Sequence, residues 1–150
     1  MIRIICVGKI KENYLVDAIK EYEKRISKYT KLEIIEVKDE AFDESKTLLK
    51  EKENIMKYVS DKDYIITMEI DGNQLSSKEF ASKLDSIQSN NSNITFIIGG
   101  SYGLHPDIKN ISNYKLSFSK MTFPHQLFRV ILLEQIYRAF KINNNETYHK

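Results

Sequence analysis

Five short apolar segments alternate with five segments of helical periodicity along this chain, and this alternation is the feature that most limits its fold. The segments that favour strands are short and apolar, at residues 2–7, 32–37, 64–70, 94–98 and 114–118. Each is followed by a segment that favours a helix, at residues 13–29, 45–59, from 76, from about 106, and 127–140. Such alternation is typical of a mostly parallel sheet with helices on both faces. We therefore expect an α/β protein.

Local signals mark the ends of some of these segments. Gly8 closes the first strand, and Asp71-Gly72-Asn73 predicts a turn after the third. Ser76 and Glu79 have the spacing of a capping box, which predicts the start of a helix.

Length and composition fit one domain, so residues 1–150 are expected to form a single unit with 41% hydrophobic and 29% charged residues. No apolar run approaches the ~20 residues of a membrane-spanning helix. The N-terminus carries no recognisable signal peptide. We therefore expect a cytoplasmic protein without a membrane partner. The single Cys6 excludes an intramolecular disulfide, and its apolar neighbours predict that it is buried.

Apolar residues cover most of the circumference of the last predicted helix, residues 127–140. A helix that is apolar all round must be covered on more than one side. A second subunit would cover it, which favours a homodimer, and a charge at Leu132 or Leu133 is then expected to dissociate or unfold the protein. The alternative is a central core helix within one chain.

Charge is unevenly distributed along the chain. Residues 1–100 hold 16 Lys and Arg against 18 Asp and Glu, whereas residues 101–150 hold seven against three. The three histidines also lie in this last third, at 105, 125 and 149. A basic end on an acidic scaffold suggests an anionic partner. Chance unevenness on a solvated surface is the alternative.

The glycine loop 99–103 follows the fourth strand and allows two functional interpretations besides a plain tight turn. Its sequence Gly-Gly-Ser-Tyr-Gly matches the nucleophile elbow of hydrolases, with Ser101, Asp107 and His125 in hydrolase order. Asp107 follows Ser101 too closely for that fold, which disfavours a hydrolase. The other interpretation is a backbone cradle, because glycines let main-chain groups approach a ligand such as adenosine. Neither a dinucleotide fingerprint nor a Walker lysine is present.

A second polar loop, residues 119–126, follows the fifth strand. His125 and Gln126 open the last helix, where backbone N–H groups point outward. His125 is a candidate for orienting a base or assisting proton transfer, although a lone histidine is often a cap or packing residue. One cysteine and three widely spaced histidines show no zinc spacing, so no metal is expected.

These segments carry a resemblance that covers essentially the whole chain. The most specific parts are Ile98-Gly99-Gly100-Ser101-Tyr102-Gly103-Leu104, residues 116–126 (LSFSKMTFPHQ), Arg129-Val130, residues 134–139 (EQIYRA) and Tyr148-His149-Lys150. They resemble the ribosomal RNA large subunit methyltransferase H family, which belongs to the SPOUT methyltransferases.

The resemblance implies a homodimer of α/β subunits with a C-terminal trefoil knot, which no sequence period would reveal. It implies S-adenosylmethionine as methyl donor and no metal. The implied donor-binding residues come from three segments: Met68, Gly99, and the run Phe118, Ser119, Lys120, Met121, Thr122 and Phe123. The implied reaction methylates N3 of a pseudouridine in large-subunit ribosomal RNA of the ribosome, with no role for DNA.

The candidate catalytic residues are His125, Arg138, Tyr148 and His149. Either histidine could accept or orient the proton of the acceptor nitrogen. Tyr148 could stack on a base, and Arg129, Arg138 and Lys120 could contact phosphate or base. Alternatively, Arg138 could pair with Glu134 four residues before it. Two other functional classes remain, a non-catalytic ribosome-binding factor of the same fold and a small serine hydrolase that uses Ser101.

Overall fold

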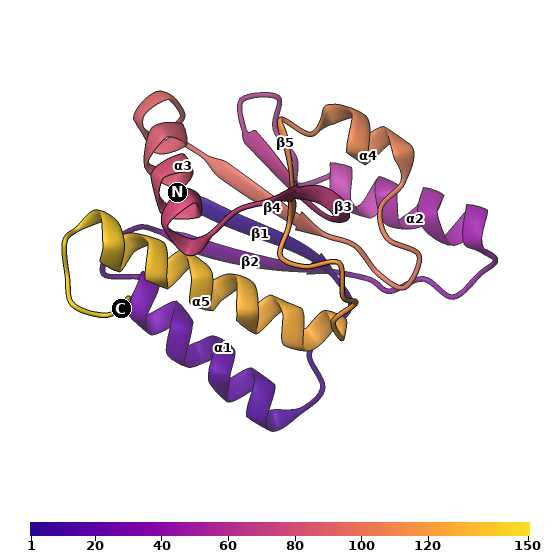
Figure 1. Cartoon of the computed structure of the whole chain (residues 1–150). Coiled ribbons are helices and arrows are strands. Elements are labelled where there is room, and N and C mark those ends of the chain that lie inside the picture. The colour runs from indigo at the N-terminus through magenta and orange to yellow at the C-terminus, as the bar shows by residue number, and fades with distance from the viewer.

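The computed structural model describes all 150 residues and contains one five-stranded parallel sheet (Figure 1). The strands are β1 (Ile2–Val7), β2 (Leu32–Val37), β3 (Tyr64–Gln74), β4 (Ile94–Ile98) and β5 (Tyr114–Ser117). The helices are α1 (Asn13–Ile26), α2 (Glu44–Met56), α3 (Ser77–Asn90), α4 (Pro106–Ile111) and α5 (His125–Asn143). The predicted alternation is confirmed, and the spatial order of the strands is β2-β1-β4-β3-β5.

Helices cover both faces of the sheet, as the alternation predicts (Figure 1). Helices α1, α3 and α5 pack on one face over a core of 22 buried residues that includes Ile4, Phe96 and Leu133. Helices α2 and α4 cover the other face over eight buried residues. Cys6 lies in the larger core, where burial raises the pKa of its thiol to about 12, so the expectation of a buried cysteine is confirmed.

Strand β3 is longer than predicted, because the expected turn at residues 71–73 is a bulge within it. Leu116 of β5 pairs with Met68 before the bulge and with Asn73 after it. Gly72 lies against β5, where a Cβ atom would come within 2.8 Å of the Lys115 carbonyl. Glycine therefore allows β3 to swing outward and return to the same partner strand.

Helix α5 is the central helix of the layer that contains α1 and α3. It contacts both neighbouring helices, and Leu132 and Leu133 have no exposed surface. These two leucines therefore belong to the core of one chain, as the alternative of a central core helix predicts, and of the two expected outcomes of a charge there their burial supports unfolding. One apolar strip of α5 stays accessible, with Leu127 41% exposed and Val130 and Ile131 partly exposed.

The implied trefoil knot stays a prediction. No helix is long and apolar enough to span a membrane.

Candidate functional site

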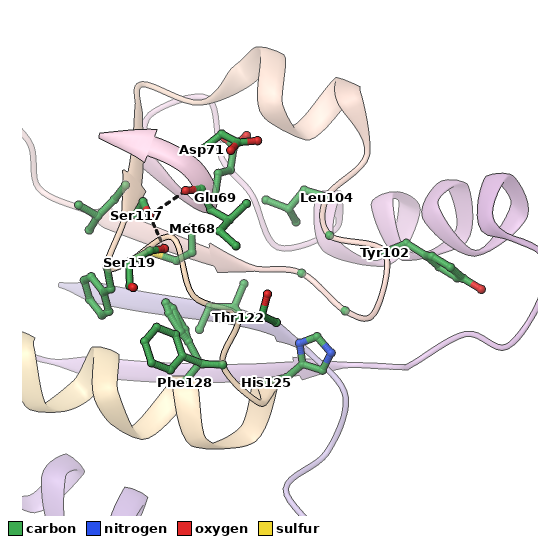
Figure 2. Close-up of a pocket in the computed structure, with 18 of the residues that line it drawn as sticks. Met68, Glu69, Asp71, Tyr102, Leu104, Ser117, Ser119, Thr122, His125 and Phe128 are labelled. Carbon is green, nitrogen blue, oxygen red and sulfur yellow. Dashed lines mark hydrogen bonds between the residues drawn. The ribbon is translucent and has the colours of Figure 1, made fainter. Parts of the chain in front are cut away.

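A cavity of about 400 Å³ lies where β3, β4 and β5 give way to loops, and we call it the glycine-loop cavity (Figure 2). Its walls come from residues within three segments far apart in the sequence, 68–71, 98–104 and 116–128, together with Lys109. Ligands of open α/β sheets bind at this edge, beyond the carboxyl ends of the strands. The cavity is therefore the candidate site.

The glycine loop is stabilised by a hydrogen bond between two of its own residues. The Gly103 N–H donates to the Gly100 carbonyl at 3.0 Å, and Gly103 has a φ of +76°, which favours glycine. A Cβ atom on Gly99 would overlap the Gly103 carbonyl. A side chain at Gly99 would therefore break the turn itself.

The buried carboxylate of Glu51 packs against Gly100. A Cβ atom on Gly100 would lie 3.2 Å from Glu51 Oε1 and 3.1 Å from Val7. Glu51 is 3% exposed, and burial raises the pKa of its carboxyl group. Its Oε2 accepts a hydrogen bond from the Glu40 N–H at 3.3 Å, while Oε1 has no partner. The helix α2 thus supports the floor of the glycine loop.

The loop after β5 is shaped by two serines. The Ser117 hydroxyl lies 2.9 Å from the Ile70 carbonyl oxygen and 3.0 Å from that of Ser119, and it can donate to either (Figure 2). The Ser119 hydroxyl accepts a hydrogen bond from the Met121 N–H at 3.0 Å. These contacts turn the loop back over the cavity and tie it to the bulge of β3.

Three phenylalanines form an aromatic wall. Phe118 meets Phe128 edge to face with ring centroids 5.2 Å apart, and Phe123 stacks on Phe128 at 5.9 Å. Both geometries are favourable for aromatic rings. This wall presents a flat apolar surface to the cavity, which suits an aromatic ligand such as a nucleobase.

The bulge of β3 adds two carboxylates that the sequence analysis missed. Glu69 and Asp71 both line the cavity, and Glu69 accepts a hydrogen bond from the Thr67 hydroxyl at 2.6 Å. The position of Glu69 directly after the predicted donor residue Met68 could have indicated its place in the cavity. Asp71 belongs to the segment for which the sequence predicts a turn. Lys109 also lines this side and lies 3.9 Å from Glu69 Oε1, so the two carboxylates leave it with a net charge of one negative unit.

Seven of the eight sequence-predicted donor residues line this cavity, and His125 lines it as well. The seven are Met68, Gly99, Phe118, Ser119, Met121, Thr122 and Phe123. Lys120 is the exception, because its side chain is exposed and lies outside the cavity wall. His125 begins α5 at the mouth of the cavity (Figure 2).

The other three predicted catalytic residues gather elsewhere, in what we call the C-terminal cluster of Glu134, Arg138, Tyr148 and His149. Arg138 Nε pairs with Glu134 at 2.8 Å, and Arg138 Nη1 lies 3.0 Å from His149 Nδ1. Tyr148 donates to Glu134 at 2.6 Å, which raises the pKa of the phenol to about 12. The alternative pairing of Arg138 with Glu134 is thus confirmed.

The C-terminal cluster and the cavity lie towards opposite ends of α5. His125 and Arg138 are thirteen positions apart, which corresponds to about 20 Å along a helix. A single chain therefore does not bring Arg138, Tyr148 and His149 to the cavity.

The three residues of the hydrolase interpretation do not form a catalytic triad. Ser101 and His125 share the cavity, but Asp107 pairs with Lys52 at 2.8 Å, and no hydrogen bond joins the three residues of the considered hydrolase triad. The Lys52 ammonium holds the pKa of Asp107 below its usual range.

Arg129 is not available for RNA, contrary to expectation, because it is 1% exposed. It pairs with Glu36 and donates to the Gly8 carbonyl at 3.1 Å. Arg129 therefore joins α5 to β1 and β2 as a structural residue.

Comparison with protein families defines the class to which this fold and site belong. The family described as "Predicted SPOUT methyltransferase" matches residues 1–149. Two solved structures share the fold. A protein from Haemophilus influenzae described as "a probable methylase family protein" has a TM-score of 0.61 at 17% identity, over 99% of this chain and 70% of that one. The tRNA (m1G37) methyltransferase of Aquifex aeolicus has a TM-score of 0.54 at 14% identity, over 91% and 69%. By the family match, the chain belongs to the SPOUT methyltransferases.

Relatives of higher sequence identity define the family within this class. Ribosomal RNA large subunit methyltransferase H of Clostridium beijerinckii is 52% identical, and that of Clostridium acetobutylicum is 50% identical, each over 99% of both chains. A relative from Methanococcus maripaludis, provisionally given the same name, is 58% identical over 99% of both chains. This chain belongs to the ribosomal RNA large subunit methyltransferase H family.

Proposed function

We propose that the protein transfers a methyl group from S-adenosylmethionine to N3 of a pseudouridine in large-subunit ribosomal RNA, in the cytoplasm and without a metal. The observation that carries the proposal is the glycine-loop cavity, which combines a backbone cradle, an aromatic wall and an acidic side. Family membership supports the reaction class, and the names of the relatives support the RNA.

The residues of the cavity fit this donor. Backbone groups of the glycine loop and of residues 118–123 would hold the adenosine portion, against the apolar surface of Phe118 and Phe128. Asp71 forms no ion pair in this chain and would balance a cationic ligand, whereas Glu69 already lies 3.9 Å from Lys109. S-adenosylmethionine supplies a methyl group on a positively charged sulfonium, which is already reactive towards a nitrogen nucleophile.

The chain's own contribution is positioning and proton handling. Aligning two reactants in the geometry of reaction can supply ~7–11 kcal/mol of the barrier. His125 stands at the cavity mouth, where it would accept or orient the proton that leaves the acceptor N3.

A homodimer would complete the site. The accessible strip of α5 contains Leu127 and Ile131, and Glu134 and Arg138 continue it at helical spacing. This strip runs from the cavity towards the C-terminal cluster. A second copy packed antiparallel along it would place its own C-terminal cluster near the first copy's cavity. Arg138, Tyr148 and His149 would then act in trans on the RNA.

The acceptor is expected within an assembled ribosomal particle. The chain carries its basic residues on the same fold that forms the cavity. It should therefore depend on phosphate contacts and on the shape of a large substrate, so protein-free RNA should be a poor substrate.

Two substitutions in one loop test the donor cavity. Thr122→Trp should lower the affinity for S-adenosylmethionine at least about tenfold, because Thr122 lines the cavity and the indole would fill it. Lys120→Trp is the matched control, since that side chain lies outside the wall and should leave affinity nearly unchanged. Calorimetric titration measures both.

A second experiment tests the acceptor. Labelled donor is supplied with ribosomes, isolated large subunits or protein-free RNA, and the product is mapped by mass spectrometry. Absence of donor binding by the unmodified protein would overturn the enzymatic proposal. Efficient methylation of free RNA or of an ordinary uridine would overturn only the assigned acceptor.

A further inference from the structure

A second hollow, which we call the lysine groove, lies beside the glycine-loop cavity at the carboxyl ends of β1 and β2. It measures about 410 Å³ and is lined by ten residues, of which only two are hydrophobic. Three of the ten are lysines, Lys9, Lys11 and Lys38. His125 lines both hollows, so the groove begins where the cavity opens.

The charges of the groove do not cancel. Lys9, Lys11 and Lys38 are exposed, and none of them forms an ion pair in this chain. The groove contains two carboxylates, Glu36 and Asp39. Glu36 is already engaged, because it pairs with Arg129 and accepts the Ile10 N–H at 3.0 Å. Three unpaired cations therefore face a single unpaired carboxylate, that of Asp39.

The loop that carries Lys9 and Lys11 is fixed in place. The Lys11 N–H donates to Gln126 Oε1 at 3.2 Å, which ties the loop to the first turn of α5. At its other end, the Gly8 N–H donates to the Val37 carbonyl at 2.9 Å, and the Gly8 carbonyl accepts from Arg129. Gly8 has a φ of +93°, which suits this sharp exit from β1. The backbone positions of the two lysines are thus set relative to His125.

We infer that the lysine groove binds the sugar-phosphate backbone of the RNA strand next to the nucleotide that enters the glycine-loop cavity. The inference rests on the proposed function, because it assumes that the acceptor at His125 belongs to RNA. Lysine ammonium groups bind phosphate as mobile point charges without reading bases. The groove therefore positions the strand and contributes affinity, whereas it leaves the choice of nucleotide to the cavity.

The test replaces the three groove lysines together, as Lys9→Gln, Lys11→Gln and Lys38→Gln. A matched control replaces Lys57, Lys62 and Lys78 by Gln, since these lysines are also exposed and unpaired but lie outside the groove. Both triple variants lose the same net charge. Binding to large ribosomal subunits is measured over a range of salt concentrations, together with methyl transfer and calorimetric binding of S-adenosylmethionine.

The groove variant should raise KM for the subunit at least about tenfold and should leave kcat and donor affinity near those of the unmodified protein. The slope of log K against log salt should fall in magnitude by about 2, because each phosphate contact with a single strand contributes ~0.7. The control variant should keep both KM and slope.

Three results would overturn the inference. One is an unchanged KM and salt slope in the groove variant. The second is an equal loss in both triple variants, which would reflect net charge alone. The third is dissociation of a dimer by the groove substitutions in sedimentation, which would make the groove a contact between copies. Donor binding and methyl transfer are also measured for the unmodified protein. Their absence there would contradict the proposed function, whereas the three results above concern the groove alone.

Discussion

At the scale of single residues, Arg129 shows how a charged side chain can belong to the scaffold of a site without entering it. Its guanidinium lies between Glu36 and the Gly8 carbonyl, and its Nε has no partner. Removing one member of a buried ion pair is strongly destabilising, because the other charge loses its partner. The pair thus joins α5 to the end of β1, beside the loop that carries Lys9 and Lys11.

We predict that Arg129→Ala lowers the free energy of unfolding by about 2–3 kcal/mol, which is below the usual range for a buried pair because Glu36 remains 35% exposed and can be hydrated. Urea denaturation measures this loss. Arg25→Ala is the control, since Arg25 forms an exposed pair with Glu21 and its removal should change stability little. Full stability of Arg129→Ala, with loss of RNA binding alone, would restore Arg129 to the RNA surface.

Residues of the site could be predicted from the sequence where they belong to a continuous segment with a recognisable local pattern. The glycine loop and residues 118–123 are continuous segments, and all of their residues except Lys120 lie in the cavity wall. Glu69 and Asp71 reach the cavity only because β3 bulges against β5, which depends on a pairing across 40 or more residues. The burial of Arg129 likewise depends on Glu36, 93 positions away. Contacts of this range leave no local pattern to interpret.

At the scale of helices and strands, hydrophobic periodicity and capping signals in the sequence predicted the positions of the elements better than their ends. The capping box of α3 is present in full: Ser76 Oγ accepts from the Glu79 N–H at 3.1 Å, and Glu79 Oε1 accepts from the Ser76 N–H at 2.8 Å. By contrast, α5 extends beyond residues 127–140 at both ends. Its N-terminus follows Pro124, and at its C-terminus Asn145 has a φ of +56°, outside the helical range.

Ser76→Ala should lower the free energy of unfolding by about 1 kcal/mol, because the first turn of α3 loses its side-chain cap. Thermal and urea denaturation measure the change. Ser82→Ala, at an exposed position within the same helix, should be neutral or slightly stabilising because alanine has the higher helix propensity. Equal effects at the two positions would show that the cap contributes nothing.

At the scale of the whole molecule, the order of the layers was predictable but the order of the strands was not. Alternation implied a parallel sheet covered on both faces, and the structure has this architecture. The sheet order β2-β1-β4-β3-β5 places β1 beside β4. The spacing of the strands in the sequence does not indicate this pairing. The pairing of β1 with β4 sets the lysine groove next to the glycine-loop cavity.

The proposed homodimer gives a prediction at this scale. Leu127→Asp should yield a folded monomer, because Leu127 is 41% exposed in one chain and lies on the accessible strip of α5. Leu132→Asp should prevent folding, since Leu132 has no exposed surface and would bury an unpaired charge. Sedimentation velocity with circular dichroism separates the two outcomes. A Leu127→Asp protein that remains a dimer would exclude this strip as the subunit contact.

The bulge of β3 has a further consequence for how such a site can diversify. Leu116 pairs with Met68 on one side of the bulge and with Asn73 on the other, so β5 is paired with β3 both before and after residues 69–72. Insertions or exchanges at residues 69–72 can therefore remodel the acidic side of the cavity, provided that close approach at Gly72 is kept. Ligand preference and sheet integrity are thereby encoded in separate, neighbouring stretches of one strand.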